Sequence, residues 1–316
     1  MEFAGISVEK GERKIVNIEI ARLYDNTTMI LPFEVIRGRE DGPVVFISSA
    51  LHGDELNGTE TIRRLLEMDI FEHMKGTIIA VPIVNVYGFN TKSRYLPDRR
   101  DLNRSFPGGP EGSLASQLAH VFTTEIVDKC THGIDLHTGA VNRSNLPQIR
   151  ACFDAGDIVQ AMAKDFGAPV TMDEPLREGS LREYCYSKNI PVILYEGGEA
   201  LRYSEKAITY ALDGIINVMT GLGMIEKLKS SHVQSNDTRR MIAASHWIRA
   251  PQSGLLVSDK KLGDMVEEGD VLGHMTDAFN HERAAIICSA KGIIIGATTT
   301  PLLNQGDATY HIAYYG

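Results

Sequence analysis

The sequence predicts an α/β fold, in which helices cover both faces of a mixed sheet, followed by a small all-β domain. Two observations predict it. Between residue 44 and about residue 225, short apolar runs alternate with segments whose apolar residues recur at helical spacing. Beyond about residue 240, the helical pattern ends and short strands with Gly-Asp turns replace it. We therefore predict one domain at residues 1–230 and a second at 240–316, joined by a polar linker at 229–240.

The first 40 residues are predicted to form one edge of the sheet. Residues 14–20 and 29–36 alternate weakly between apolar and polar side chains, with polar turn residues between them. Alternation with a period of two predicts an antiparallel pair of strands.

Three apolar runs then predict buried strands, at residues 44–47, 78–84 and 191–195, and residues 134–137 are interpreted as a further short strand end. Apolar residues three or four positions apart predict the helices between and after them. These residues are Ile62, Leu65 and Leu66, then Leu118, Phe122 and Ile126, then Ile158, Met162 and Phe166, and last Ile208, Leu212, Ile215, Met219 and Leu222. Such alternation is typical of a parallel or mixed sheet that is covered on both faces.

The C-terminal part contains an internal quasi-repeat. Residues 250–256 lead to 268–272, and residues 289–294 lead in the same way to 305–308. Two similar halves predict a small β-sandwich that resembles the fold of biotinyl and lipoyl carriers. Those carriers need a modifiable Lys between the halves, and residues 274–279 contain none. We therefore reject a carrier role and expect a structural or substrate-shaping domain.

Composition excludes some classes of function. The net charge of -9, with Asp+Glu 41 against Lys+Arg 32, argues against a nucleic-acid-binding surface. Cys130, Cys152, Cys185 and Cys288 form no C-x-x-C pair and are predicted to be free thiols in a reducing compartment. The N-terminus has no apolar signal region, and no stretch reaches transmembrane length. We expect a cytoplasmic protein without a membrane partner, and the sequence leaves open whether it forms a homo-oligomer.

His52 and Glu55 follow the first buried strand, at a turn marked by Gly53 and Gly58. In an open α/β sheet, ligands bind just past the carboxyl ends of the strands. A His-x-x-Glu pair is nevertheless common by chance, and Glu55 could instead begin the cap of the following helix. A second histidine at another strand end, His137, favours a metal pair over that alternative.

Two imidazoles and one carboxylate are the protein ligands of a catalytic zinc site. His52, Glu55 and His137 supply such a set. Zinc lowers the pKa of a bound water to about 7 and polarises a carbonyl group.

A further carboxylate has to take the proton of the water and pass it to a leaving amine. Glu196 is our candidate, because it ends the strand at 191–195 and lies outside the ligand set. Asp54 is the competing carboxylate. Asp135 precedes His137 by two residues and is either its hydrogen-bond partner or a buried structural Asp.

The polar loop at residues 85–109 contains Arg94, Arg99, Arg100 and Arg104. For an arbitrary loop, a solvated surface is the favoured interpretation. Next to a metal site, Arg can instead hold a carboxylate through two hydrogen bonds or stabilise an oxyanion.

The motifs His52-Gly53-Asp54-Glu55, Asp101-Leu102-Asn103-Arg104 and Asp135-Leu136-His137, with the late Glu196, resemble the succinylglutamate desuccinylase/aspartoacylase family. This family is a branch of the zinc carboxypeptidase superfamily. The resemblance covers roughly residues 40–225, together with the C-terminal β domain that such proteins usually carry. It implies a zinc-carboxypeptidase-like fold and one Zn²⁺ per chain.

The resemblance also implies the roles of single residues. His52, Glu55 and His137 bind zinc, and Glu196 acts as general base and then as general acid. Asn103 and Arg104 hold the carboxylate of a small substrate. Arg94 polarises the scissile carbonyl, with Arg99 and Arg100 as alternatives, because the spacing from Arg94 to Asp101 is about two residues longer than in aspartoacylase.

The sequence therefore favours a zinc hydrolase that removes an acyl group from a small N-acylated amino acid or related amine. A metallocarboxypeptidase acting on a short peptide is the alternative within the same fold. A non-enzymatic binding protein is the third hypothesis, and the intact set of ligands and base argues against it.

Overall fold

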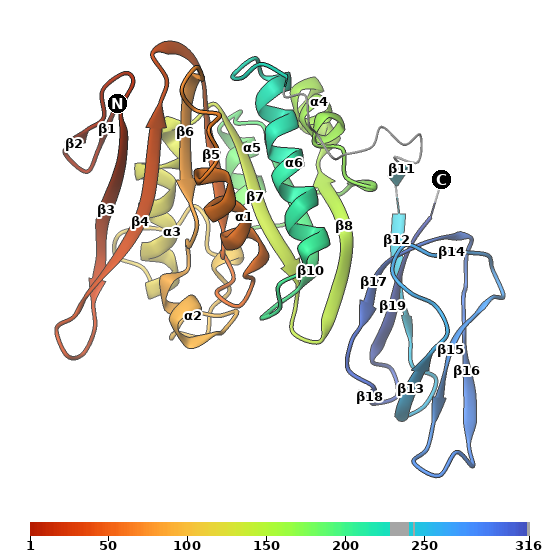
Figure 1. Cartoon of the computed structure of the whole chain (residues 1–316). Coiled ribbons are helices and arrows are strands. Elements are labelled where there is room, and N and C mark those ends of the chain that lie inside the picture. Colours follow the sequence, from red (N-terminus) through yellow and green to blue (C-terminus); the bar gives the residue numbers. More distant parts are fainter. Residues whose placement is uncertain (228–239, 243, 315–316) are drawn as a thin grey trace.

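The computed structural model describes residues 1–227, 240–242 and 244–314. The predicted linker at 229–240 lies outside the described residues except for its last position. Figure 1 shows a large twisted sheet with helices in front of it and behind it, and a β-rich C-terminal part beside strand β8, at the right.

The large sheet combines parallel and antiparallel strands. Its strands are, in spatial order, β12 (Ala244–Arg249), β19 (Ala308–Tyr314), β17 (Gly292–Thr298), β8 (Arg143–Ala151), β10 (Val192–Glu199), β7 (His132–Gly139), β5 (Glu40–Ser49), β6 (Lys75–Val81), β4 (Thr28–Arg37) and β3 (Arg13–Arg22). Three short strands pair beside this path, namely β9 (Val170–Asp173), β11 (Arg240–Ile242) and β14 (Met265–Val266), and β1 (Glu2–Phe3) pairs with β2 (Ile6–Ser7). The predicted N-terminal edge is confirmed, since β3 and β4 are antiparallel and β3 ends the sheet.

Helices cover both faces of this sheet, as predicted. They are α1 (Asn57–Leu66), α2 (Val86–Thr91), α3 (Leu114–Glu125), α4 (Asp157–Phe166), α5 (Leu181–Ser187) and α6 (Glu205–Gly221), with short 3₁₀ turns η1 (Leu102–Arg104), η2 (Val127–Lys129) and η3 (Phe153–Ala155). Strand β5 shows how the faces divide. Phe46 packs into the core of α3 and α5, whereas Val45 and Ile47 pack into the core of α1, α4 and α6. Successive side chains of a strand point to opposite faces, so an all-apolar strand serves both cores.

One detail of the helix prediction is wrong. Ile158 is 50% exposed, and the buried face of α4 is formed by Val159, Met162, Ala163 and Phe166. The helix begins at Asp157, so Ile158 lies in its first turn and faces solvent. The four cysteines are free thiols, as predicted. Within the described ranges, no helix has both the length and the apolar character that crossing a membrane requires.

The C-terminal part is a two-layered β structure, as predicted. A second sheet of β16 (Arg283–Ile287), β15 (Val271–Thr276), β13 (Gly254–Ser258) and β18 (Leu302–Leu303) shares a core with β17 and β19. That core contains Leu272, Met275, Ile294, Tyr310 and Ile312.

One layer of this structure continues the central sheet, which the sequence did not predict. Gly296 of β17 is the register partner of Asn145 of β8, and Ala297 that of Ser144. The sequence pattern did not reveal β8 because polar residues and a proline interrupt its apolar residues. This pairing brings the C-terminal strands close to β10 and its carboxyl end.

Candidate active site

The turn after β5 positions the first two candidate ligands. Gly53 lies so close to the backbone of helix α2 that a Cβ atom there would be 1.9 Å from the carbonyl carbon of Gly88. A Cβ on Gly58 would be 2.3 Å from Ser49 Oγ, so this glycine allows α1 to start against the sheet. The two glycines therefore hold His52 and Glu55 over the sheet edge.

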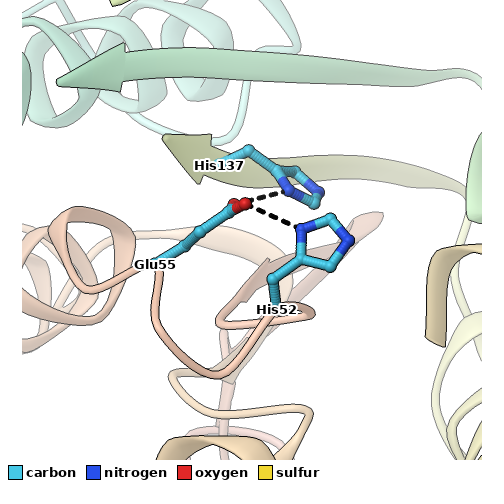
Figure 2. Close-up of side chains that lie close together, drawn as sticks. All are labelled: His52, Glu55 and His137. Atoms are coloured by element: carbon cyan, nitrogen blue, oxygen red, sulfur yellow. Dashed lines mark hydrogen bonds and ion pairs between the residues drawn. The ribbon is translucent and has the colours of Figure 1, made fainter. Parts of the chain in front are cut away.

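Three side chains meet at this edge, as the sequence predicted. The Glu55 carboxylate contacts both imidazoles, with Oε1 2.8 Å from Nδ1 of His52 and Oε2 2.8 Å from Nδ1 of His137 (Figure 2). One ligand atom from each residue lies within 4.8 Å of the others, and all three side chains are buried. Such a His-Glu-His set could hold a metal ion, and it is a donor set of catalytic zinc sites.

The other nitrogen of each ring contacts a second carboxylate. Nε2 of His52 is 3.0 Å from Asp101 Oδ1, and Nε2 of His137 is 2.7 Å from Asp135 Oδ2. Ser48 Oγ donates a 2.7 Å hydrogen bond to the other oxygen of Asp135. Carboxylates behind histidine ligands fix the ring orientation and raise the basicity of the ligand. Of the two alternatives for Asp135, the structure therefore supports the hydrogen-bond partner.

The charges of the cluster are strongly coupled. Burial by itself lowers the pKa of His137, but the nearby Asp135 and Glu55 outweigh it, and the pKa lies well above 6.5. Burial by itself raises the pKa of Glu55, but His52 and His137 outweigh it and hold the pKa far below its usual range. The two imidazoles therefore favour the anionic form of Glu55.

Asp54 is a weaker candidate than its neighbour. It is not among the residues that line the cleft, and its Oδ1 is buried with no hydrogen-bond partner in the described part of the chain. Burial, followed by the charge of Glu55, raises its pKa. Its position therefore separates it from the groups that could hold a metal.

Glu196 lies beside His137. The two residues are register partners on the parallel strands β10 and β7, and both line the same cleft. Asn145 Nδ2 donates a 2.6 Å hydrogen bond to Glu196 Oε2, and Arg150 Nε is 3.6 Å from Glu196 Oε1. The Glu196 carboxylate thus lies next to the His-Glu-His set without belonging to it, and the Asn145 amide and the Arg150 guanidinium hold it in place.

The arginine loop supplies further groups. Arg94 bridges the cluster, with its two terminal nitrogens 3.3 Å from Glu55 Oε1 and 3.1 Å from Asp101 Oδ2. Arg99 and Arg100 are exposed and do not line the cleft, so the geometry favours Arg94 over both alternatives. Asn103 and Arg104 both line the cleft.

The cleft has a volume of about 400 Å³, and the sequence analysis missed part of its wall. The missed residues that line it include Arg143, Asn145 and Arg150 of β8, Glu174 and Arg177 after β9, Arg182 of α5, Ser245 and Trp247 of β12, and His311 of β19. The rings of Trp247 and His311 stack, with their centroids 4.6 Å apart and an interplanar angle of 10°. Cζ of Arg143 lies 5.3 Å from the centroid of the Trp247 ring. The polar residues of β8, such as Arg143, Asn145 and Arg150, were the signal in the sequence that could have revealed this wall.

His311 makes stability depend on pH. Burial, followed by the charge of Arg150, lowers its pKa to about 3, against 6.5 in the unfolded chain. Between these values the unfolded chain binds a proton that the folded protein excludes, so stability falls as pH decreases through this window. We expect the wild type to lose on the order of 2 kcal/mol more unfolding free energy between pH 7 and pH 4 than His311→Gln does. Urea unfolding at both pH values measures this, and equal losses would contradict the prediction.

Comparison with known proteins shows the family to which the chain belongs. A model of the succinylglutamate desuccinylase/aspartoacylase catalytic domain matches residues 41–222, more than half of the chain. The chain belongs to this family. The matched range includes the His-Glu-His cluster, the arginine loop and Glu196, whereas Ser245, Trp247 and His311 lie beyond it.

Individual proteins that resemble this chain are consistent with the family assignment. An N-alpha-acetyl-L-2,4-diaminobutyric acid deacetylase of Halomonas elongata is 27% identical over 294 residues, which cover 90% of this chain and 86% of that protein. Two solved structures share the fold at 22% identity, each with 98% of both chains covered. They are a succinylglutamate desuccinylase/aspartoacylase of Rhodobacter sphaeroides, with a TM-score of 0.87, and the product-bound ectoine utilization protein EutE (DoeB) of Ruegeria pomeroyi, with a TM-score of 0.86. The chain is thus a member of a family of deacylases and has the desuccinylase/aspartoacylase fold.

Proposed function

We propose that this member of the family is a zinc-dependent amidohydrolase that removes the acyl group from a small N-acylated amino acid. The observation that carries the proposal is the Glu55 carboxylate bonded to both imidazoles, with Glu196 on the adjacent strand of the same cleft. The deacetylase of Halomonas elongata supports the reaction class, because its name describes removal of an acetyl group from an amino acid.

His52, Glu55 and His137 would hold one zinc ion per chain. When bound, zinc supplies a water of lowered pKa and polarises the scissile carbonyl. Asp101 and Asp135 keep both imidazoles oriented through the ring nitrogens that face away from Glu55.

Glu196 moves the proton. Its carboxylate takes a proton from the attacking water as the bond from oxygen to carbonyl carbon forms. The same carboxyl group then gives that proton to the nitrogen as the C–N bond breaks, and a carboxylate and an amine are released. Asn145 and Arg150 hold the carboxylate at the cleft wall through both of its oxygens. Arg94, beside Glu55, stabilises the negative charge that develops on the carbonyl oxygen.

Asn103 and Arg104 select a substrate with a free carboxylate close to the amide. An Arg binds a carboxylate through two parallel charge-assisted hydrogen bonds, which an ammonium group cannot reproduce. We expect Arg104→Lys to lower kcat/KM for an N-acyl amino acid, and Arg104→Ala to cost up to about 2–5 kcal/mol in transition-state stabilisation.

The measurement compares each N-acyl amino acid with its methyl ester in wild type and in both variants. The wild type should prefer the free acid, and the preference should shrink in Arg104→Ala. Equal turnover of acid and ester, with a ratio that Arg104→Ala leaves unchanged, would contradict this role. It would favour the interpretation of the arginine loop as a solvated surface loop.

A metallocarboxypeptidase of short peptides is the alternative. The C-terminal strands argue against it, because Trp247 and His311 form part of the wall of a cleft of only about 400 Å³. The test is a hydrolysis screen of zinc-loaded protein against N-acetyl amino acids, N-succinyl amino acids and short peptides. We expect turnover of the acyl amino acids, and a clear preference for peptides would establish the alternative. The cytoplasmic location stays a prediction.

A further inference from the structure

One row of register partners crosses the large sheet from its C-terminal strands to β10, the strand that carries Glu196. In spatial order it consists of Trp247 in β12, His311 in β19, Gly296 in β17, Asn145 in β8 and Gly198 in β10. Register partners of antiparallel strands project from the same face of a sheet. Trp247, His311 and Asn145 accordingly all line the cleft. The C-terminal strands thus reach Asn145 through the backbone of Gly296.

A bulge in β8 turns the Asn145 side chain to the face of the sheet that carries Glu196. Glu196 is the register partner of Gln148. Two positions further along β10, Gly198 is the register partner of Asn145, so residues 146–147 of β8 lie opposite a single residue of β10. Residues three positions apart on a regular strand point to opposite faces. The extra residue of the bulge reverses this and places Asn145 beside Glu196.

Asn145 lies between Glu196 and strand β17. Its Nδ2 donates the 2.6 Å hydrogen bond to Glu196 Oε2. A Cβ atom on Gly296 would be 3.1 Å from Oδ1 of the same amide, 3.1 Å from His311 Cβ and 3.4 Å from Cη2 of Trp247. Asn145 is only 7% exposed, so the amide has little free space into which it could move. Any side chain at position 296 would therefore press on the amide that holds Glu196.

The orientation of this amide is decisive for Glu196. An ionised carboxylate only accepts hydrogen bonds, so the NH₂ group of Asn145 has to face it and the amide oxygen faces Gly296. Arg150 Nε, at 3.6 Å from Glu196 Oε1, lies beyond hydrogen-bond distance and contributes its charge. Within the described part of the chain, Asn145 is thus the group whose hydrogen bond fixes the direction of the carboxylate.

We propose that Gly296 is a positioning residue for the proton transfer, and that strand β17 holds the Glu196 carboxylate in place through Asn145. The absence of a side chain at position 296 leaves the space that the amide occupies. The C-terminal strands therefore support the chemical step as well as enclosing the cleft. This inference rests on the proposed function, in which Glu196 moves the proton.

Gly296→Ala in zinc-loaded protein tests the proposal. We expect kcat for an N-acyl amino acid to fall by about ten-fold, because a small displacement of a catalytic group is costly. KM should stay within about two-fold of the wild type, since Glu196 acts on the chemical step rather than on substrate binding. Ile294→Val is the matched control. Ile294 lies in the same strand and is buried in the C-terminal core, so the control should lower the unfolding midpoint and leave kcat unchanged.

A double-mutant cycle separates positioning from a general structural effect. If Gly296 acts through Asn145, Gly296→Ala should change kcat by less than about two-fold in the Asn145→Ala background. An equal loss in both backgrounds, or an unchanged kcat in the single variant, overturns the proposal. If Gly296→Ala does not fold by itself, the double variant decides. Restored folding supports the contact with Asn145, and a double variant that stays unfolded overturns it.

Crystal structures of the wild type and of Gly296→Ala test the inference apart from hydrolysis. The distance from Asn145 Nδ2 to Glu196 Oε2 should lengthen beyond about 3.5 Å in the variant. An unchanged hydrogen bond in the variant overturns the positioning role and leaves the hydrolase standing. A lengthened distance in a protein that cleaves no amide supports the positioning of Glu196 and overturns only the proposed reaction.

Discussion

Replacing His52 or His137 by Ala should reduce the zinc content from about one ion per chain to near zero and abolish hydrolysis. Each substitution removes one of the three proposed ligands and leaves Glu55 buried with one imidazole partner fewer. Metal analysis of the purified proteins, after dialysis against zinc-free buffer, measures the first effect. Turnover of an N-acyl amino acid measures the second.

Two controls sharpen the metal prediction. Asp135→Asn should weaken zinc binding by about 10–100-fold without abolishing it, because it alters the partner of a ligand rather than a ligand. His281→Ala, at an exposed position of the C-terminal part, should keep full zinc content. Full zinc content in both His52→Ala and His137→Ala would overturn the assignment of the site.

Glu196→Gln should lower kcat by roughly two or more orders of magnitude while zinc content and fold are kept. General acid–base catalysis contributes about this much, and the amide keeps the shape of the side chain but cannot take the proton. Asn145→Ala should lower kcat less, because Arg150 still holds the carboxylate after the 2.6 Å hydrogen bond is lost. Single-turnover kinetics on zinc-loaded protein separates the chemical step from product release.

Asp54→Asn is the matched comparison for Glu196→Gln. Asp54 is a carboxylate next to Glu55, but it does not line the cleft. Asp54→Asn should therefore lower kcat far less than Glu196→Gln does. Activity of Glu196→Gln within a few-fold of wild type, together with a large loss in Asp54→Asn, would move the proton transfer to Asp54.

The sequence alone predicted the fold class, because strands and helices follow from local periodicity. The all-apolar β5 and the amphipathic α6 are examples, since each pattern lies within one element. The His-Glu-His cluster was also predictable. His52 and Glu55 lie three residues apart on a glycine turn. His137 lies near the carboxyl end of the neighbouring strand β7, and parallel strands bring their carboxyl ends together.

Only the tertiary structure decided how the site is enclosed. Strand β8 pairs with β10 on one side and with β17 on the other, and this second pairing carries Trp247 and His311 to the cleft. It also decided that Gln148 lies opposite Glu196 and that two arginines share Glu174. These contacts join residues far apart in the chain through strand register. Register depends on which faces of both strands are buried and on the connections between them, so the pattern within one strand does not fix its partner.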